Sequence, residues 1–347
     1  MKFLSFVALA SMAMAAPANK KRADALDVQL EQIGNTEVRA VISNNGVNNL
    51  KVLKTGTILD SNPVEKVQVF QNSTYEEVPF DGLRLLVSTE SLDEDAFRTI
   101  AAGTSIEVTF DIAELHDLAA GGSFDLVSAG ALPIAEADST TISGVVTFAS
   151  NPTVASVNGA EAAAVRRALV DKRFAVQSDC TGTRLTTVQN AQSVCRTLAT
   201  AAQSAANSDN ARMTEFFKSS SSSTKSTVAT VFSRIASACG SSSGQRLYCS
   251  DVYGACSNGV IAYTLPSSSY MAYCPYFFNS MPLRGTGCYT QAQGNTIVHE
   301  ATHLTQIKGT SDYGGYGYNF VRSLSASQNL NHADTYTLFA QSIAAGC

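Results

Sequence analysis

The cysteines constrain this sequence most, because all eight of them lie in its second half. They are Cys180, Cys195, Cys239, Cys249, Cys256, Cys274, Cys288 and Cys347. None is spaced as Cys-x-x-Cys, which disfavours a zinc finger built from thiolates and a thioredoxin-like redox site. An even number of cysteines in a secreted chain predicts up to four disulfides, although eight cysteines allow roughly a hundred pairings.

The N-terminal residues have the pattern of a secretory signal peptide. Lys2 is followed by an apolar run over residues 3–16, which ends in the Ala-x-Ala pattern Ala13-Met14-Ala15, followed by Ala16. We expect residues 1–16 to be this signal peptide, although an N-terminal core helix is an alternative. The run is too short to cross a bilayer, and no later segment replaces it. A secreted, extracellular protein with oxidised cysteines is therefore expected, and not a membrane protein.

A pair of basic residues, Lys172-Arg173, lies where the charge of the chain changes sign. Residues 174–347 carry ten Lys and Arg against seven Asp and Glu, a net charge of +3, which leaves −8 for residues 1–173. The total of −5 excludes a globally basic nucleic-acid binder, and opposite charges favour association of the two halves. We expect residues 17–173 to be a propeptide that a processing protease specific for basic pairs removes after Arg173. A cut at Arg166-Arg167 and a solvated linker are the alternatives.

The two halves also differ in the secondary structure that they predict. Short alternating or β-branched runs in the first half predict strands at residues 38–42, 67–70, 83–87 and 106–110, with one helix near 93–102. Apolar residues with helical spacing in the second half predict helices over residues 185–206, 210–217, 222–238, 296–308 and 331–345. The predicted class is α+β: a β-rich propeptide, then a mainly helical domain, residues 174–347, with a small disulfide-bonded β region. A monomer is expected.

The pattern His-Glu-x-x-His at residues 299–303 predicts a metal site with a general base beside it. Residues four apart lie on one face of a helix, so His299 and His303 can bind the same metal ion. Glu300 leaves the same turn and can take a proton from a metal-bound water without acting as a ligand. Two unrelated histidines on a surface helix are the alternative. Only four histidines occur in the chain, which makes that alternative the weaker one.

A catalytic zinc needs a third protein ligand. No Glu follows Glu300, and a third His six residues beyond His303 is excluded because that position is Gly309. The remaining donors are Asp312, His332 and Asp334. Asp312 lies in a Gly-rich turn that can fold back under the helix. Asp334 is the second choice, although it also suits a helix N-terminus, and His332 is expected at the surface or as a cap.

The sequence after His303 reads Gly-Thr-Ser-Asp-Tyr-Gly-Gly-Tyr-Gly over residues 309–317. With His-Glu-x-x-His before it, this resembles the deuterolysin family of fungal zinc metalloproteases, the aspzincins, whose pattern is Gly-Thr-x-Asp-x-x-Tyr-Gly. The resemblance covers residues 174–347 and includes Ala-Tyr-Thr-Leu-Pro at 262–266 and Ala-Asp-Thr-Tyr at 333–336. It implies a zincin-like catalytic domain that cleaves proteins or peptides, preceded by its own propeptide.

The resemblance also implies roles for individual residues. His299, His303 and Asp312 would hold one zinc ion, and Glu300 would be the general base. The family's oxyanion-stabilising tyrosine falls on Tyr316, but Gly315 makes the spacing one residue longer, so Tyr313 and Tyr318 stay open as alternatives. In relatives the counterpart of Asp334 lines the pocket for the residue after the scissile bond and favours Lys or Arg there. Thr337 stands where lysine-specific relatives have a second acid.

The family pattern further implies three disulfides, which pair Cys180 with Cys249, Cys256 with Cys274, and Cys288 with Cys347. A fourth bridge between the remaining Cys195 and Cys239 is the simplest use of both. Gly-x-Ser-x-Gly at residues 240–244 is a chance match, because it follows a predicted helix and not a strand. The predicted function is a secreted zinc metalloendopeptidase made as a proenzyme. The alternative is a secreted, disulfide-stabilised binding protein with a structural or degenerate metal site.

Overall fold

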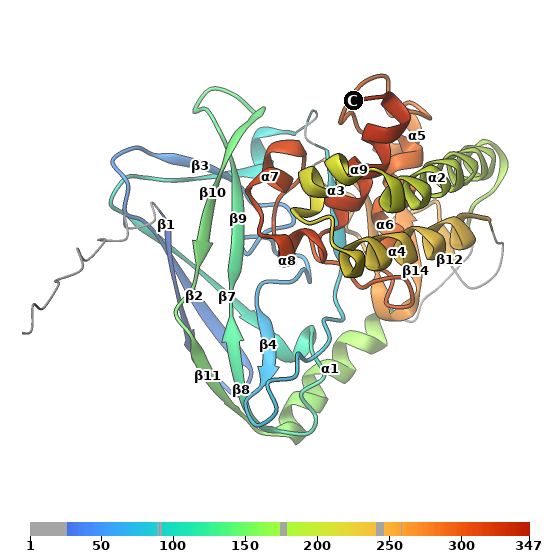
Figure 1. Ribbon diagram of the computed structural model, residues 1–347. Coiled ribbons are helices and arrows are strands. Elements are labelled where there is room, and N and C mark those ends of the chain that lie inside the picture. Colours follow the sequence, from blue (N-terminus) through green and yellow to red (C-terminus); the bar gives the residue numbers. More distant parts are fainter. Residues whose placement is uncertain (1–25, 89, 91, 174–178, 241–245, 258) are drawn as a thin grey trace, which may run out of the picture.

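The chain folds into a β-rich half and a helix-rich half that lie side by side (Figure 1). Figure 1 shows a computed structural model, which describes residues 26–347 except 89, 91, 174–178, 241–245 and 258, and the backbone alone for 167–173. The proposed signal peptide and Phe174 lie outside the described residues. Within that part of the chain, no helix combines the length and the apolar character needed to cross a membrane.

The first half forms three antiparallel sheets around one hydrophobic core. Their strand orders are β1-β2-β7, β10-β9-β3-β6 and β11-β8-β4. The strands are β1 (Leu26–Gln32), β2 (Glu37–Asn44), β3 (Leu50–Leu53), β4 (Gln68–Gln71), β6 (Phe97–Ile100), β7 (Ser105–Asp111), β8 (Gly122–Val127), β9 (Ala129–Ala135), β10 (Ile142–Ala149) and β11 (Thr153–Val157). The sequence of β2 explains why it forms a strand with one buried face. Val38, Ala40 and Ile42 are buried on that face and alternate with more exposed residues.

The predicted helix at residues 93–102 is wrong. Only Glu94–Ala96 form a single 3-10 turn, and the chain then continues as β6. Strand β6 pairs with β3 in the register Leu50↔Ile100, and Phe97 and Ile100 are buried against the sheet. Pairing with a distant strand overrides the local helical tendency here.

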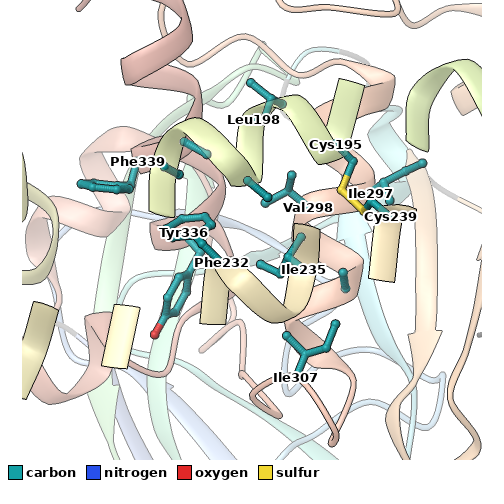
Figure 2. Close-up of a cluster of buried hydrophobic side chains, with 14 of the residues drawn as sticks. Cys195, Leu198, Phe232, Ile235, Cys239, Ile297, Val298, Ile307, Tyr336 and Phe339 are labelled. Carbon is teal, nitrogen blue, oxygen red and sulfur yellow. A yellow bond between two sulfur atoms is a disulfide. The ribbon is translucent and has the colours of Figure 1, made fainter. Parts of the chain in front are cut away.

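The second half packs its helices around α6, which carries the His-Glu-x-x-His pattern. The helices are α2 (Gly182–Ser208), α3 (Asn210–Phe217), α4 (Ser222–Gly240), α5 (Pro275–Asn279), α6 (Gln293–His303), α7 (Tyr318–Ser323), α8 (Ala326–Asn329) and α9 (Ala333–Ala345). Every residue of α6 is buried, because α2, α4, α9 and strand β13 (Val260–Leu265) pack around it. Figure 2 shows Ile297 and Val298 of α6 within this core, between residues of α2, α4 and α9.

Helix α6 is shorter at its C-terminal end than the predicted helix over 296–308. It ends at His303 because Leu304 leaves the helical conformation with ψ at 129°. Residues 304–309 then form a turn, in which the amides of Ile307, Lys308 and Gly309 donate to the Leu304 carbonyl. This early exit returns the chain toward His303.

Four disulfides link the second half, with the pairings that the sequence analysis expected. They join Cys180 to Cys249, Cys195 to Cys239, Cys256 to Cys274, and Cys288 to Cys347. The bridge between Cys195 and Cys239 joins α2 to the end of α4 within the core (Figure 2). The protein is thus a mixed α/β fold with four disulfides.

A fourth sheet joins the two halves. Its order is β12-β14-β13-β5, in which β12 (Arg246–Tyr248), β13 and β14 (Tyr270–Tyr273) come from the second half and β5 (Arg84–Val87) comes from the first. Strand β5 pairs antiparallel with β13. The first half ends in helix α1 (Gly159–Arg173), so the backbone of the basic pair Lys172-Arg173 is helical and not an extended linker.

Candidate metal centre and active site

Helix α6 places both histidines of the pattern on one face. The ring centroids of His299 and His303 are 4.9 Å apart, and both side chains are fully buried. The exit of the chain at Leu304 then brings Asp312 beside them. Its Oδ1 lies 3.2 Å from His299 Nε2, and its Oδ2 lies 3.4 Å from His303 Nε2.

These three side chains form a donor set that fits a zinc ion. One ligand atom from each of His299, His303 and Asp312 lies within 4.8 Å of the other two. Both Nε2 atoms and Asp312 Oδ1 are buried without a hydrogen-bond partner, although buried polar atoms are normally paired. Two imidazole nitrogens and one carboxylate oxygen are ligands that zinc accepts, with further positions left for water or substrate. In the described residues, no other group of His, Cys, Asp and Glu is arranged in this way.

Hydrogen bonds from neighbouring backbone hold the loop that carries Asp312. The carbonyl of Thr310 accepts from His303 Nδ1 at 2.9 Å, which directs the lone pair of Nε2 toward the site. The amide of Ser311 donates to the Asn331 carbonyl at 2.8 Å. His332 Nε2 donates to the carbonyls of Asp312 and Gly315, both at 3.1 Å.

The expectation that His332 is a surface residue is therefore wrong. It is the N-cap residue of α9, as the alternative proposed, but it is fully buried. Its ring packs against Tyr313 and Phe320, and burial lowers its pKa, so the ring is neutral near pH 7. His332 supports the loop around Asp312 and is not one of the three clustered ligands.

The charges and the burial around the site shift the pKa of each candidate ligand. Burial lowers the pKa of His303 to about 3, so its ring is neutral as a metal ligand requires. Burial also acts to lower the pKa of His299, but the carboxylates of Asp312 and Asp334 outweigh it and raise that pKa to about 10. A metal ion must therefore displace a proton from His299. The two histidines hold the pKa of Asp312 well below its usual range despite burial.

Glu300 lies beside this cluster with one free oxygen. Its Oε2 accepts a hydrogen bond of 2.6 Å from Thr264 of β13, whereas Oε1 is buried without a partner. Burial raises the pKa of Glu300 to about 8. A carboxylate with a raised pKa and one unpaired oxygen can accept a proton from water and release it again. No sequence pattern marks Thr264 as a site residue, although it lies in the stretch Ala-Tyr-Thr-Leu-Pro at 262–266.

Of the three candidate tyrosines, Tyr316 is the one whose ring lies beside His299. Its ring centroid is 6.0 Å from that of His299, and its hydroxyl donates a hydrogen bond to the carbonyl of Leu85 in β5. The alternatives lie elsewhere: Tyr318 donates to Glu215 and stacks on Tyr289, and the Tyr313 hydroxyl accepts from Asn331.

Positions 314 and 315 need glycine because the loop is tightly packed around both of them. A Cβ atom on Gly315 would lie 2.5 Å from the ring of Phe320, and one on Gly314 would lie 2.5 Å from the carbonyl oxygen of Ala131. Gly314 also has φ at +75°, a conformation that favours glycine. The loop therefore accommodates Gly315 and still brings Tyr316 to His299.

Asp334 contacts His299 from the side opposite the ligand atoms. Its Oδ1 lies 3.4 Å from His299 Nδ1, and its Oδ2 accepts a 2.6 Å hydrogen bond from the amide of Gly317. The carboxylate thus lies beside the imidazole, and it is not one of the three clustered side chains. Asp334 and Thr337 also line a cavity together with His299 and Leu86. The Gly-x-Ser-x-Gly match lies largely outside the described residues.

Comparison with known proteins shows which family the chain resembles. The sequence model of the family described as "Deuterolysin metalloprotease (M35) family" matches residues 2–347. A "Neutral protease 2 homolog" of Colletotrichum graminicola is 58% identical over 331 residues, 94% of each chain. Another, from Phaeosphaeria nodorum, is 56% identical over 355 residues and the full length of both chains. Among solved structures, a zinc peptidase from Grifola frondosa matches 47% of this chain and 97% of its own, at 25% identity and a TM-score of 0.40.

Proposed function

Because the chain belongs to the deuterolysin metalloprotease family and is a zinc metalloprotease, we propose that it is a secreted endopeptidase made as a proenzyme, with His299, His303 and Asp312 as ligands of one zinc ion. The observation that carries this proposal is the buried cluster of unpaired ligand atoms beside the free Oε1 of Glu300. A purely structural metal site would have no use for that free carboxylate oxygen, which disfavours the alternative of a binding protein.

The residues around the site have separate tasks in the proposed reaction. When bound, zinc polarises the scissile carbonyl and makes a water molecule acidic near neutral pH. Glu300 takes the proton of the attacking water through Oε1 and passes it to the leaving amine. The Tyr316 hydroxyl donates a hydrogen bond to the oxygen of the scissile carbonyl as negative charge develops on that oxygen. The Thr310 carbonyl keeps the imidazole of His303 oriented through its Nδ1 atom, and the negative charge of Asp334 lies 3.4 Å from Nδ1 of His299.

The proenzyme part of the proposal is supported by the contacts between the halves. Strand β5 of the proposed propeptide, residues 17–173, pairs with β13 and contacts helix α6. Removal of residues 17–173 by a cut after Arg173 would leave residues 174–347 with all four disulfides. The preference for basic residues next to the scissile bond stays a prediction. Asp334 Oδ2 accepts from the Gly317 amide and Oδ1 lies 3.4 Å from His299 Nδ1, so we do not build the proposal on a substrate cation at that carboxylate.

One experiment tests the proposed activity directly. The full-length chain is expressed with secretion, and the purified product is assayed for casein digestion before and after treatment with 1,10-phenanthroline. We expect digestion that the chelator abolishes and added zinc restores, about one zinc per chain by elemental analysis, and an N-terminus at Phe174. A processed protein that binds zinc but does not digest casein would support the binding-protein alternative instead.

A further inference from the structure

The loop over residues 309–317 is held from two sides. On the side of the first half, the hydroxyl of Ser311 donates to Glu65 Oε2 at 2.8 Å. The amide of Ala131 donates to the carbonyl of Tyr313 at 3.0 Å. Glu65 and Ala131 belong to the proposed propeptide, so its removal takes both contacts away. The processed enzyme must therefore hold this loop with contacts from the second half.

The imidazole of His332 contacts the loop at two points from the second half. Its Nε2 lies 3.1 Å from the carbonyl oxygens of Asp312 and Gly315. Because a carbonyl oxygen can only accept, Nε2 must carry a proton. The first carbonyl belongs to the proposed zinc ligand, and the second lies in the peptide bond to Tyr316. A single ring thus binds the main chain at the zinc ligand and next to the proposed oxyanion donor.

The ring of His332 is itself held in place by neighbouring side chains. Its Nδ1 lies 3.1 Å from Oγ1 of Thr335, in the first turn of α9. The Thr335 hydroxyl donates in turn to Oδ1 of Asn329, in α8, at 2.9 Å. All three side chains are fully buried, and the ring of Phe320 packs against the imidazole. With both ring nitrogens engaged and its face covered, the imidazole has a fixed orientation.

We infer that His332 is a positioning residue, which Thr335 holds in place and which fixes Asp312 for zinc binding and Tyr316 for oxyanion stabilisation in the processed enzyme. This inference rests on the proposed function. His332 acts through the main chain of the loop and not as a member of the ligand cluster. A change in its orientation should displace the ligand and the oxyanion donor together, and small displacements of reacting groups cost much of the rate.

The test changes Thr335 and leaves the residues of the proposed reaction intact. Thr335→Val removes the hydroxyl at nearly constant volume, and Thr335→Ser retains it. The enzyme is the processed product of the full-length chain, and the parent is first shown to digest casein. We expect Thr335→Val to weaken zinc binding by about 10-fold to 100-fold, measured by competition with a chelator. At saturating zinc it should also lower kcat by about tenfold, with a smaller change in KM. Thr335→Ser should restore most of both.

Ser342→Ala is the matched control in the same helix. The Ser342 hydroxyl is buried and donates to the carbonyl of Phe339, within α9, at 2.8 Å. We expect this variant to keep the zinc affinity and the kcat of the parent. The inference would be overturned by a Thr335→Val variant that binds zinc as tightly as the parent, by equal losses in Thr335→Val and Thr335→Ser, or by the same loss in Ser342→Ala.

A second measurement needs no substitution and serves also if Thr335→Val is not secreted. Residues 174–347 contain three histidines, and His332 is the one that is not a proposed zinc ligand. Nitrogen-15 NMR of the zinc-loaded processed enzyme should show a proton on Nε2 of His332. An Nε2 without a proton would refute the inference and leave the proposed function intact. A parent that contains no zinc or does not digest casein would instead refute the proposed function and the inference with it.

Discussion

The hydroxyl of Thr264 donates a 2.6 Å hydrogen bond to Oε2 of Glu300, and both side chains are fully buried. The two residues are 36 positions apart and belong to different elements, β13 and α6. Because Thr264 engages one oxygen of the carboxylate, the other oxygen is left for proton transfer. A residue on strand β13 thereby sets the orientation of the proposed general base.

Replacing Thr264 with Val should lower kcat by about tenfold or more, because Glu300 loses the contact that orients it. Zinc content, measured by elemental analysis, should not change. Thr264→Ser retains a hydroxyl and should restore most of the activity. Equal loss in both variants would indicate that packing, and not the hydrogen bond, is what matters at this position.

Glu300→Gln should reduce casein digestion by about 100-fold to 10,000-fold, because the amide cannot accept the proton of the attacking water. The variant keeps the size of the side chain and leaves the three proposed ligands in place, so it should still contain about one zinc per chain. Full activity of the zinc-loaded Glu300→Gln variant would refute the assigned base, and this measurement needs zinc analysis and rate assays on the same sample.

Asp312→Ala should abolish both stoichiometric zinc binding and proteolysis, because two imidazoles alone leave the ion without its third protein ligand. Asp334→Asn is the informative comparison. We expect it to retain zinc with weakened affinity, by about 10-fold to 100-fold, since Asp334 acts on His299 only through Nδ1. If zinc loss were complete for Asp334→Asn and slight for Asp312→Ala, Asp334 and not Asp312 would be the third zinc ligand. Competition with a chelator of known affinity measures both.

Tyr316→Phe should lower kcat by about 100-fold to 1,000-fold with a smaller change in KM, because the donated hydrogen bond matters most as charge develops on the oxygen. Tyr318→Phe removes a hydroxyl that is bonded to Glu215, away from the metal ligands, and should leave kcat nearly unchanged. If Tyr318→Phe were the damaging variant, the assignment across the additional Gly315 would be incorrect.

Replacing Cys195 and Cys239 together with Ala should lower the free energy of unfolding by about 4 kcal/mol, the loop-closure value for a bridge of this span. The bridge spans 44 residues and joins α2 to α4 beside α6. Denaturant unfolding of the processed enzyme measures the difference. A loss below about 1 kcal/mol would show that packing of the two helices already provides this stability without the disulfide.

Features that depend on neighbouring residues could be predicted from the sequence. The four-residue spacing of His299 and His303 places both rings on one helical face wherever that helix lies in the fold. The helix from Asn210 to Phe217 and the strand around Val38 to Ile42 follow from local periodicity in the same way. The resemblance to a known family added Asp312 and three disulfide pairings, which spacing alone leaves open.

Other features were decided by contacts between residues that are far apart in the chain. The bond from Tyr316 to Leu85 spans 231 positions, and no local pattern marks Leu85 as an active-site neighbour. Contacts between distant residues also explain the burial of His332, the position of the Asp334 carboxylate beside His299 and the strand at residues 97–100. Periodicity predicts which face of a helix or strand is apolar. Which element packs against that face depends on the tertiary structure, because every buried polar atom must also find a hydrogen-bond partner there.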